Sequence, residues 1–440
     1  MPDGELDERL AAHNAAPLIK GDLLLNAYRK DVLVLPTELL NRTPGLVHEL
    51  NNLLQNADLG RPMDEDERVT IDPASAVTGL RLLPGVDALG VVSDLLSKAL
   101  QESAAGLSPT TAEAARRLAV DRLYEPGDPV VQDPPDPSIS LLASGSKQGH
   151  GDAGRVPVTL FAAAPGWRSL SGTRPVVALL DTAVNDRHDW LSPSRRDPFC
   201  VDAATLGWRP PPQQRQTKDS YAGHGTFTAG LVRQVAPDVS VLSVQLMHDD
   251  GVVDGSTFVN ALKWLHDGLV DGETSRRVDV LCIPFGYEPA ASDEKHNDEL
   301  KAWLKRIAEH GVRIVASAGN RGSDTKTYPA AFATEPDLPL TSVGAQNPDK
   351  RPAHYSNHGN WVTDWEIGTG VISTMPRELN GVLTRPEVPK SLFPNAIGDT
   401  LDPDSFVGGF ARWSGTSFAA AVVAGRKAQE MVDTHPAGRP

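Results

Sequence analysis

The sequence predicts an α/β protein, with a mostly parallel β-sheet flanked by helices on both faces and preceded by a small α+β domain. Near-continuous apolar segments recur through the C-terminal part of the 440-residue chain, separated by amphipathic segments of helix length. Near residue 125 the pattern is interrupted by a segment rich in proline, glycine and serine. We therefore expect an N-terminal domain at 1–124, a linker at 125–173 and a larger domain at 174–435.

The N-terminal domain carries both helical and strand patterns. Apolar residues three and four positions apart predict helices over Pro44 to Leu54 and Asp87 to Leu100. Thr110 to Leu123 opens with a capping pattern and continues alanine-rich, which predicts a third helix. Short strands are predicted at Asp31 to Pro36 and at Thr78 to Pro84, so the domain combines helices with strands.

In the larger domain, predicted strands alternate with predicted helices. The linker contributes one further apolar stretch, Val156 to Ala164, that could pair as a strand. The strands are predicted at Pro175 to Asp181, Val239 to Met247, Val278 to Phe285, Arg313 to Ala318 and Leu338 to Gln346. The helices are predicted from about His224, over about Ser256 to Leu269 and Asp293 to His310, and after Ser417. In such sheets, ligands bind at the carboxyl ends of the strands.

Composition and charge exclude several classes of protein. Acidic residues outnumber basic ones, 57 to 42, so the electrostatic field disfavours nucleic acid and anionic membranes as partners. The N-terminal residues lack the pattern of a secretory signal, and no apolar run approaches the ~18 residues of a membrane span. We therefore expect a cytoplasmic protein, with its two cysteines, Cys200 and Cys282, reduced.

Four short segments carry the groups that acyl transfer needs. An apolar strand ends in Asp181, where a carboxylate can orient a base, and Gly223 and Gly225 flank His224 at a predicted helix start. Ser417 stands at the mouth of a helix of small residues, whose positive end faces any oxyanion that develops. Another apolar strand ends in Gly-Asn320, where an amide can donate a second hydrogen bond. Together these are a nucleophile, a base, an orienting acid and two oxyanion donors.

Each segment alone has an ordinary structural explanation as a turn or a helix cap. Asp181 alone could bind a ribose in a dinucleotide fold, but no G-x-G-x-x-G follows a first strand. His354 and His358, and the cluster His248-Asp249-Asp250, lack a metal-ligand pattern. We therefore expect neither a metal nor a cofactor. The order Asp, His, Ser matches subtilisin and neither chymotrypsin nor the α/β-hydrolases.

The segments D-T-A, G-H-G-T-x-x-A-G, A-S-A-G-N and S-G-T-S-x-A-A, in this order, resemble the four signature segments of the subtilisin-like serine proteases, the subtilases. The resemblance extends from about Arg174 to His435. It implies a subtilisin-like fold and a serine endopeptidase with Asp181, His224 and Ser417 as the catalytic triad and Asn320 in the oxyanion hole.

The resemblance also implies two walls of the substrate-binding site. These walls are formed by Ser317, Ala318 and Gly319 on one side and Pro284, Phe285 and Gly286 on the other. The chain departs from the family where Ala183 replaces a glycine, Phe227 a second histidine and Tyr287 a small residue. About 30 extra residues also precede the nucleophile, between Thr374 and Ser414. None of these departures removes a catalytic group.

The N-terminal domain has two interpretations. It resembles a prodomain that would be removed in the linker, near Pro126 to Gly154, or it is a permanent domain that regulates the protease or binds a regulatory protein partner. We favour the second, since the segment is long and no secretion signal precedes it. The substrates expected are proteins or precursor peptides. The alternative function is a catalytically silent or autoinhibited binding protein with the subtilase fold.

Overall fold

The computed structural model describes residues 11, 14–20, 23–55, 63, 76–101, 109–124, 154–166, 173–192, 199–210, 221–288, 294–381, 385, 387, 397–399 and 402–434. The described residues fall into two compact units. The first unit draws on residues 1–124, 253–271 and 287–307, and the second on 125–252, 272–286 and 308–440. Both units are therefore discontinuous in the sequence. The domain boundaries expected above, which follow the chain without a break, stay predictions.

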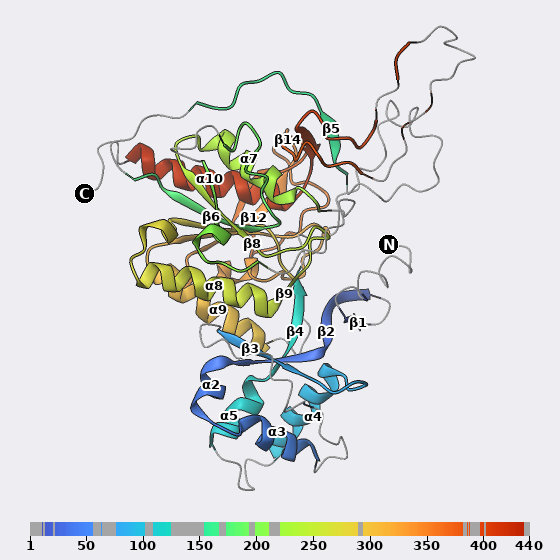
Figure 1. Ribbon diagram of the computed structural model, residues 1–440, viewed down its shortest axis with the longest axis vertical. Helices are drawn as coiled ribbons and strands as arrows, with labels where there is room; N and C mark the ends of the chain where they lie inside the picture. Colours follow the sequence, from blue (N-terminus) through green and yellow to red (C-terminus); the bar gives the residue numbers. More distant parts are fainter. Residues whose placement is uncertain are drawn as a thin grey trace. The chain divides into compact units, whose positions relative to one another are not determined.

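A seven-stranded sheet forms the centre of the second unit (Figure 1). Its order is β13 (Asp364–Ile367), β12 (Leu340–Gln346), β11 (Arg313–Ser317), β10 (Val280–Ile283), β6 (Val176–Asp181), β8 (Ser240–Gln245) and β7 (Cys200–Asp202). Every pairing in it is parallel. The inner strands are buried almost throughout, which explains their near-continuous apolar sequences. The predicted α/β class and parallel sheet are confirmed.

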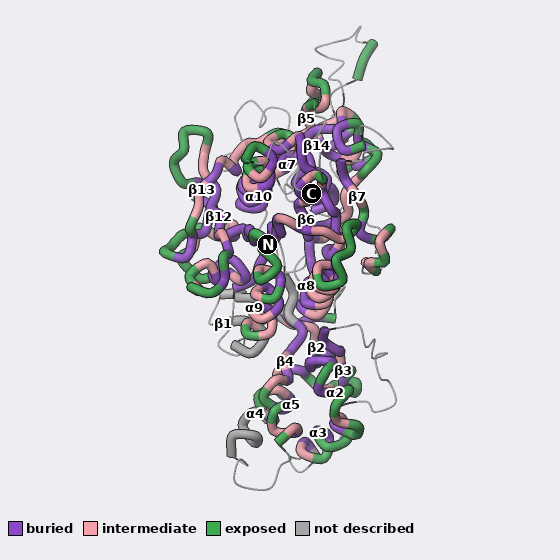
Figure 2. Tube along the Cα trace, turned by 90° about the vertical axis from the view of Figure 1, so that its left-hand side faces the viewer, coloured by how far each residue is buried: buried purple, intermediate pink, exposed green. Residues whose placement is uncertain are grey.

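Two helices of the second unit pack against each other through small residues. They are α7 (His224–Val235) and α10 (Thr416–Thr434). A Cβ atom on Gly425 of α10 would lie 2.7 Å from a methyl group of Val235, and one on Gly230 of α7 would lie 2.1 Å from the Thr374 hydroxyl. The alanine- and glycine-rich sequence after Ser417 therefore follows from close helix packing. In Figure 2, the first half of α10 (residues 416–425) and most of the strands β6 and β12 are coloured as buried.

A small antiparallel sheet completes the second unit, together with the 3-10 turns η2 (Ala203–Leu206), η3 (Thr274–Arg276) and η4 (Ala330–Thr334). The sheet places β15 (Phe410–Trp413) between β14 (Val371–Thr374) and β5 (Val156–Val158). β5 confirms a strand within Val156 to Ala164, but one of three residues only. The remaining linker residues 125–153 and 167–172 lie outside the described part of the chain.

The first unit is built on a second sheet, of strand order β1 (Ala15–Lys20), β2 (Leu23–Pro36), β4 (Ala119–Tyr124) and β9 (Val253–Asp254), with β3 (Val77–Arg81) also paired to β2. In the described part of residues 1–124, the helices that accompany these strands are α2 (Thr37–Arg42), α3 (Leu46–Gln55), α4 (Ala88–Gln101) and α5 (Pro109–Arg117). The helix predicted over Thr110 to Leu123 is therefore wrong after Arg117. The residues that follow form β4 because β2 and β9 supply strand partners, which local helix propensity cannot anticipate.

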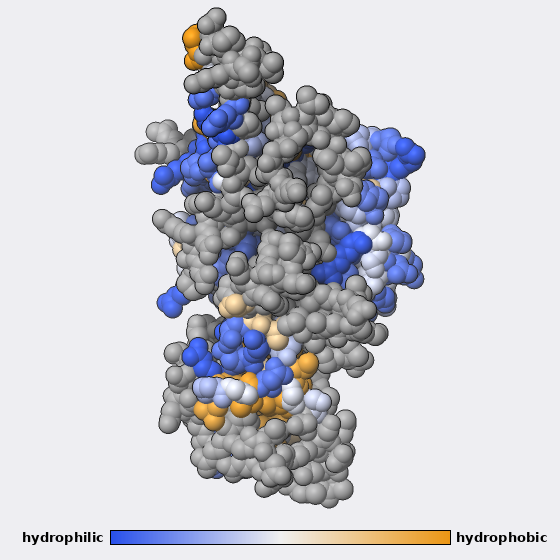
Figure 3. Space-filling view, turned by 90° about the vertical axis from the view of Figure 1, so that its right-hand side faces the viewer, coloured by the Kyte–Doolittle hydropathy of each residue, from blue (hydrophilic) through white to orange (hydrophobic). Residues whose placement is uncertain are grey.

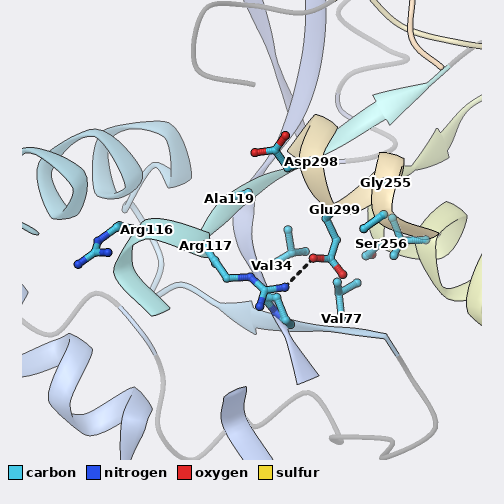
Figure 4. Close-up of a pocket in the computed structure, with 12 residues that line it drawn as sticks. Val34, Val77, Arg116, Arg117, Ala119, Gly255, Ser256, Asp298 and Glu299 are labelled. Carbon is cyan, nitrogen blue, oxygen red and sulfur yellow. Dashed lines mark hydrogen bonds and ion pairs between the residues drawn. The ribbon is translucent and has the colours of Figure 1, made fainter. Parts of the chain in front are cut away.

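The same unit contains α8 (Gly255–Val270) and α9 (Glu294–Glu309) as far as Ile307, on the opposite side of β2 and β3 from α2 to α5 (Figure 1). The side-chain oxygen of Asn260 on α8 accepts hydrogen bonds from the backbone N–H groups of Ala76 (2.8 Å) and Val77 (3.3 Å). Arg117 donates to Glu299 of α9 at 2.7 Å. Figure 4 shows this ion pair beside a cavity of about 340 Å³. Residues far apart in the sequence are therefore joined by specific polar contacts.

The hydropathy of the surface drawn in Figure 3 differs between the two units. Among the residues described, those of the second unit are mainly hydrophilic on this face, whereas hydrophobic side chains gather on the first unit. Within the described residues, no helix is long and apolar enough to cross a membrane.

Candidate active site

Asp181 is the last residue of β6, and its side chain is buried. One carboxylate oxygen, Oδ1, accepts a hydrogen bond from the backbone N–H of Thr182 at 2.6 Å and lies 2.7 Å from Nδ1 of His224. The backbone carbonyl accepts from Leu246 (2.9 Å) and Met247 (3.2 Å). Hydrogen bonds therefore fix both the backbone and the carboxylate of Asp181.

His224 is the first residue of α7, and the two glycines beside it are required by packing. Gly223 adopts a φ of +84°, a conformation that favours glycine, and caps the helix. A Cβ on Gly225 would lie 2.2 Å from the carbonyl oxygen of Thr182, and the Gly225 N–H donates to the Thr182 hydroxyl at 2.9 Å. The glycine therefore lets α7 begin directly against the end of β6, which aligns the imidazole with the carboxylate.

Aromatic rings surround the His224 side chain, which is 2% exposed. Trp413 meets it edge-on, with centroids 5.5 Å apart and planes at 87°, and Phe418 lies at 5.3 Å and Tyr221 at 5.9 Å. Phe227, which stands where the family has a second histidine, is fully buried and packs on Trp413 and Phe418. This departure therefore extends the apolar packing behind the base.

Ser417 lies in the first turn of α10 and is 1% exposed. Its hydroxyl donates a hydrogen bond to the carbonyl oxygen of Pro284 at 2.6 Å. Backbone N–H groups in a first helical turn lack partners within the helix and point toward its positive end. The next residue, Phe418, is one of the rings packed on His224, so the first turn of α10 and the histidine belong to one cluster.

Asn320 follows β11 and is partly buried. Its side-chain oxygen accepts from the backbone N–H of Thr416 at 2.9 Å and from the hydroxyl of the same residue at 2.8 Å. These two bonds fix the orientation of the amide beside Ser417. The Nδ2 group is then the donor that this side chain can present.

The two expected walls of the substrate site follow neighbouring strands. Parallel pairing of Ile283 with Ala316 brings the ends of β10 and β11 to the same edge of the sheet. All six wall residues are buried: Pro284, Phe285, Gly286, Ser317, Ala318 and Gly319. Gly319 has a φ of +99°, and a Cβ on Gly286 would lie 2.7 Å from the carbonyl oxygen of Tyr328. Tyr287 is buried, and its hydroxyl donates to Asn297 of α9.

The two cysteines that the sequence analysis expected to be reduced lie in the interior of the protein. Cys200 and Cys282 are buried and unpaired. Burial raises the pKa of each thiol, so neither is a ready nucleophile.

Sequence reasoning missed Arg155 and Trp413, which belong to the surroundings of His224. No local pattern marks either of them, because their partners are distant in the sequence.

Comparison with known proteins places this fold and site in a class. Residues 172–436 match the model of the subtilase family, which is more than half of the chain. The chain belongs to the subtilase family. The resemblance read from the four sequence segments is thus confirmed.

Individual relatives are distant. The chain is 28% identical over 178 residues to the major intracellular serine protease of Bacillus subtilis (strain 168), which covers 37% of this chain and 50% of that protein. It is 24% identical over 219 residues to subtilisin E of the same organism, covering 47% and 50%. The chain thus spans about half the length of these curated relatives. A solved lanthipeptide protease matches with a TM-score of 0.44 and 22% identity, covering 60% of this chain and 76% of that one.

Proposed function

We propose that this chain is a serine endopeptidase that hydrolyses peptide bonds through Asp181, His224 and Ser417. The observation that carries the proposal is the buried pair of Asp181 and His224, 2.7 Å apart, in one cluster with the first turn of α10. A carboxylate held on Nδ1 fixes the tautomer in which Nε2 can accept a proton. Membership of the subtilase family supports the same chemistry.

In this mechanism the Ser417 oxygen bonds to the carbonyl carbon of the scissile peptide while its proton passes to His224. The negative charge that develops on the carbonyl oxygen is stabilised by the Ser417 N–H and the Asn320 amide. When the tetrahedral intermediate collapses, the peptide C–N bond breaks and His224 gives its proton to the leaving amine. Water then hydrolyses the acyl-enzyme by the same route, and Asp181 stabilises the imidazolium in each step.

Two observations favour a latent form of this protease. The Ser417 hydroxyl donates to the Pro284 carbonyl, so it must rotate before it can donate to His224. Ser417 and His224 are each 1% exposed as whole residues, so a substrate carbonyl can reach the serine only after a local opening. The same closed arrangement favours, as a second candidate, an autoinhibited or catalytically silent binding protein with this fold.

We further propose that the N-terminal domain regulates the protease in the cytoplasm and offers a surface to a regulatory protein partner. Its residues contact α8 and α9, which lie inside the segment matched by the subtilase model, through the Asn260 and Glu299 contacts. β4 also pairs with β9, at Leu123 with Asp254 and Tyr124 with Val253. The similarity to a protease named as intracellular supports the cytoplasmic location. Proteins or precursor peptides are the proposed substrates.

The test is labelling of the full-length protein with a fluorophosphonate, which reacts with activated serines. We expect the wild type to be labelled and a Ser417→Ala variant to stay unlabelled. If the wild type is not labelled, the measurement is repeated after limited proteolysis of the linker. Labelling that appears only then supports latency, whereas its absence in both conditions favours the silent binding protein.

A further inference from the structure

Arg155 lies in the segment expected to be a linker, yet the residue is only 2% exposed. It directly precedes β5, which pairs with β15 at Val156 with Arg412 and at Val158 with Phe410. β15 ends at Trp413, four residues before Ser417. The strand pairing therefore delivers the Arg155 side chain to the surroundings of the catalytic cluster.

The guanidinium group of Arg155 contacts groups that border His224. It lies 5.5 Å from the ring centroid of Trp413 and 5.5 Å from that of Phe406, and it donates to the carbonyl oxygen of Ala222 at 2.5 Å. Trp413 is the ring that meets His224 edge-on, and Ala222 lies two residues before it in the turn that begins α7. One side chain thus supports both the ring beside the imidazole and the backbone that carries it.

A buried guanidinium needs compensating charge and hydrogen bonds, and this site supplies them. Burial, and then Asp250, raise the pKa of Asp249, and the Arg155 charge opposes that rise, so the two groups interact. The backbone carbonyl of Asp249 accepts from Tyr221 at 3.0 Å, and Tyr221 also lies against the His224 ring. Arg155 is therefore coupled to Trp413 and Ala222, which neighbour the base, and to the loop of Asp249, which contacts the base through Tyr221.

A second arginine ties the same segment to the other end of α7. Arg233, in the last turn of that helix, is 2% exposed and donates to the carbonyl oxygens of Pro165 and Pro237. Its guanidinium also lies 4.8 Å from the Phe199 ring centroid. Residues 154–166, here called the brace segment, thus contact the chain just before α7 and the helix near its end.

We propose that Arg155 is a positioning residue of the protease, and that through Trp413 and Ala222 it holds the His224 imidazole in the orientation that accepts the Ser417 proton. The inference rests on the proposed function. Arg155 lies 17 residues before the segment matched by the subtilase model begins, at residue 172. The brace segment is then a working part of the peptidase rather than a tether between domains.

The experiment compares full-length Arg155→Met and Arg155→Lys variants with the wild type by the rate and the final extent of fluorophosphonate labelling. Methionine keeps much of the side-chain length but removes the charge and the donors, whereas lysine keeps the charge and loses the planar fork. Arg412→Met, on the neighbouring strand β15, is the matched control. Circular dichroism and thermal unfolding establish that each variant folds.

We expect Arg155→Met to reach the same final extent of labelling but at a rate lower by roughly 10- to 100-fold, the effect of a misplaced catalytic group. Arg155→Lys should recover part of the rate, and Arg412→Met should match the wild type. A role in folding alone predicts instead a smaller labelled fraction that reacts at the normal rate. If the Arg155→Met variant fails to fold, the Arg155→Lys variant is judged by the rate and the final extent of its labelling.

The proposal is overturned if the folded variants are labelled at the wild-type rate, or if only the labelled fraction falls. That outcome leaves the proposed function intact, because the wild type is still labelled. If neither the wild type nor any variant is labelled before and after linker proteolysis, the proposed function fails first and this inference fails with it.

Discussion

Asp121 joins β4 to the start of α8 and provides a sharp test of how the N-terminal residues are held there. Its side chain is fully buried, and its two carboxylate oxygens accept from the backbone N–H (2.9 Å) and the hydroxyl (3.1 Å) of Ser256. Arg29 lies 3.6 Å away, and Asp254 caps the same helix by accepting from Thr257 at 2.8 Å. Two carboxylates thus converge on one helix N-terminus.

Burial and the Asp254 charge raise the pKa of Asp121 to about 7, against an ordinary value of 3.8. This difference corresponds to roughly 4 kcal/mol between the protonated and ionised forms. Because the pKa of Asp121 is higher in the folded than in the unfolded protein, its contribution to stability is complete below pH 3.8 and is lost as the pH rises to about 7. We therefore predict that the packing of β4 against α8 weakens from pH 5 to 7, and that Asp121→Asn removes this dependence.

Hydrogen exchange of the peptide spanning 119–124, corrected for intrinsic exchange rates, measures this opening in the full chain. Between pH 5 and 7 the wild type should lose protection by roughly 50-fold, because Asp121 goes from almost fully protonated to half ionised over this range, while Asp121→Asn stays level. The matched control is Asp267→Asn, which removes a partly exposed carboxylate paired with Lys263 on α8 and should keep the wild-type dependence. Protection in the wild type that is constant or rises with pH would refute the reasoning, as would a slope retained in Asp121→Asn.

Three further predictions concern the active site and the thiols. Gly225→Ala places a Cβ 2.2 Å from the Thr182 carbonyl oxygen, so we expect displacement of His224 to slow fluorophosphonate labelling by at least about 10-fold. Gly166→Ala, with open space around it, is the control and should be labelled at the wild-type rate. Labelling of Gly225→Ala at the wild-type rate would exclude the close approach. Asn320→Ala should lower kcat, measured with casein as substrate, by about 10²- to 10³-fold, which is the loss known for an oxyanion donor in subtilisin. An unchanged kcat would show that Asn320 is not part of the oxyanion hole. Since burial raises the pKa of both thiols, iodoacetamide at pH 8 should alkylate the two cysteines only in urea, and rapid modification of the native protein would contradict their burial.

The parts of the fold that the sequence predicts are those governed by local pattern. Apolar runs such as Val176–Asp181 become inner strands, and the small residues after Ser417 become the buried helix α10. Asp181 and Asn320 could be predicted as candidates for a related reason, since each comes at or after the end of an inner strand of the parallel sheet. The carboxyl ends of parallel strands share one edge, so residues that follow separate strands come together there.

Features that depend on distant partners could not be predicted. The residues after Arg117 form β4 because strands β2 and β9 lie beside them, although the local sequence favours a helix. The burial of Arg155 depends on Phe406 and Trp413, which are about 250 residues away in the sequence. Likewise, a carboxylate such as Asp121 gains its raised pKa from Asp254 and from burial, neither of which a sequence pattern records.

The pairing of β5 with β15 has a consequence for handling the protein in pieces. A fragment that begins at residue 172, where the family match starts, lacks β5, so β15 becomes an edge strand with unpaired backbone N–H and C=O groups. Such edges recruit strands from other molecules. A fragment beginning near residue 150 retains β5 and the Arg155 and Pro165 contacts, so a comparison of the two fragments measures what this segment contributes to solubility.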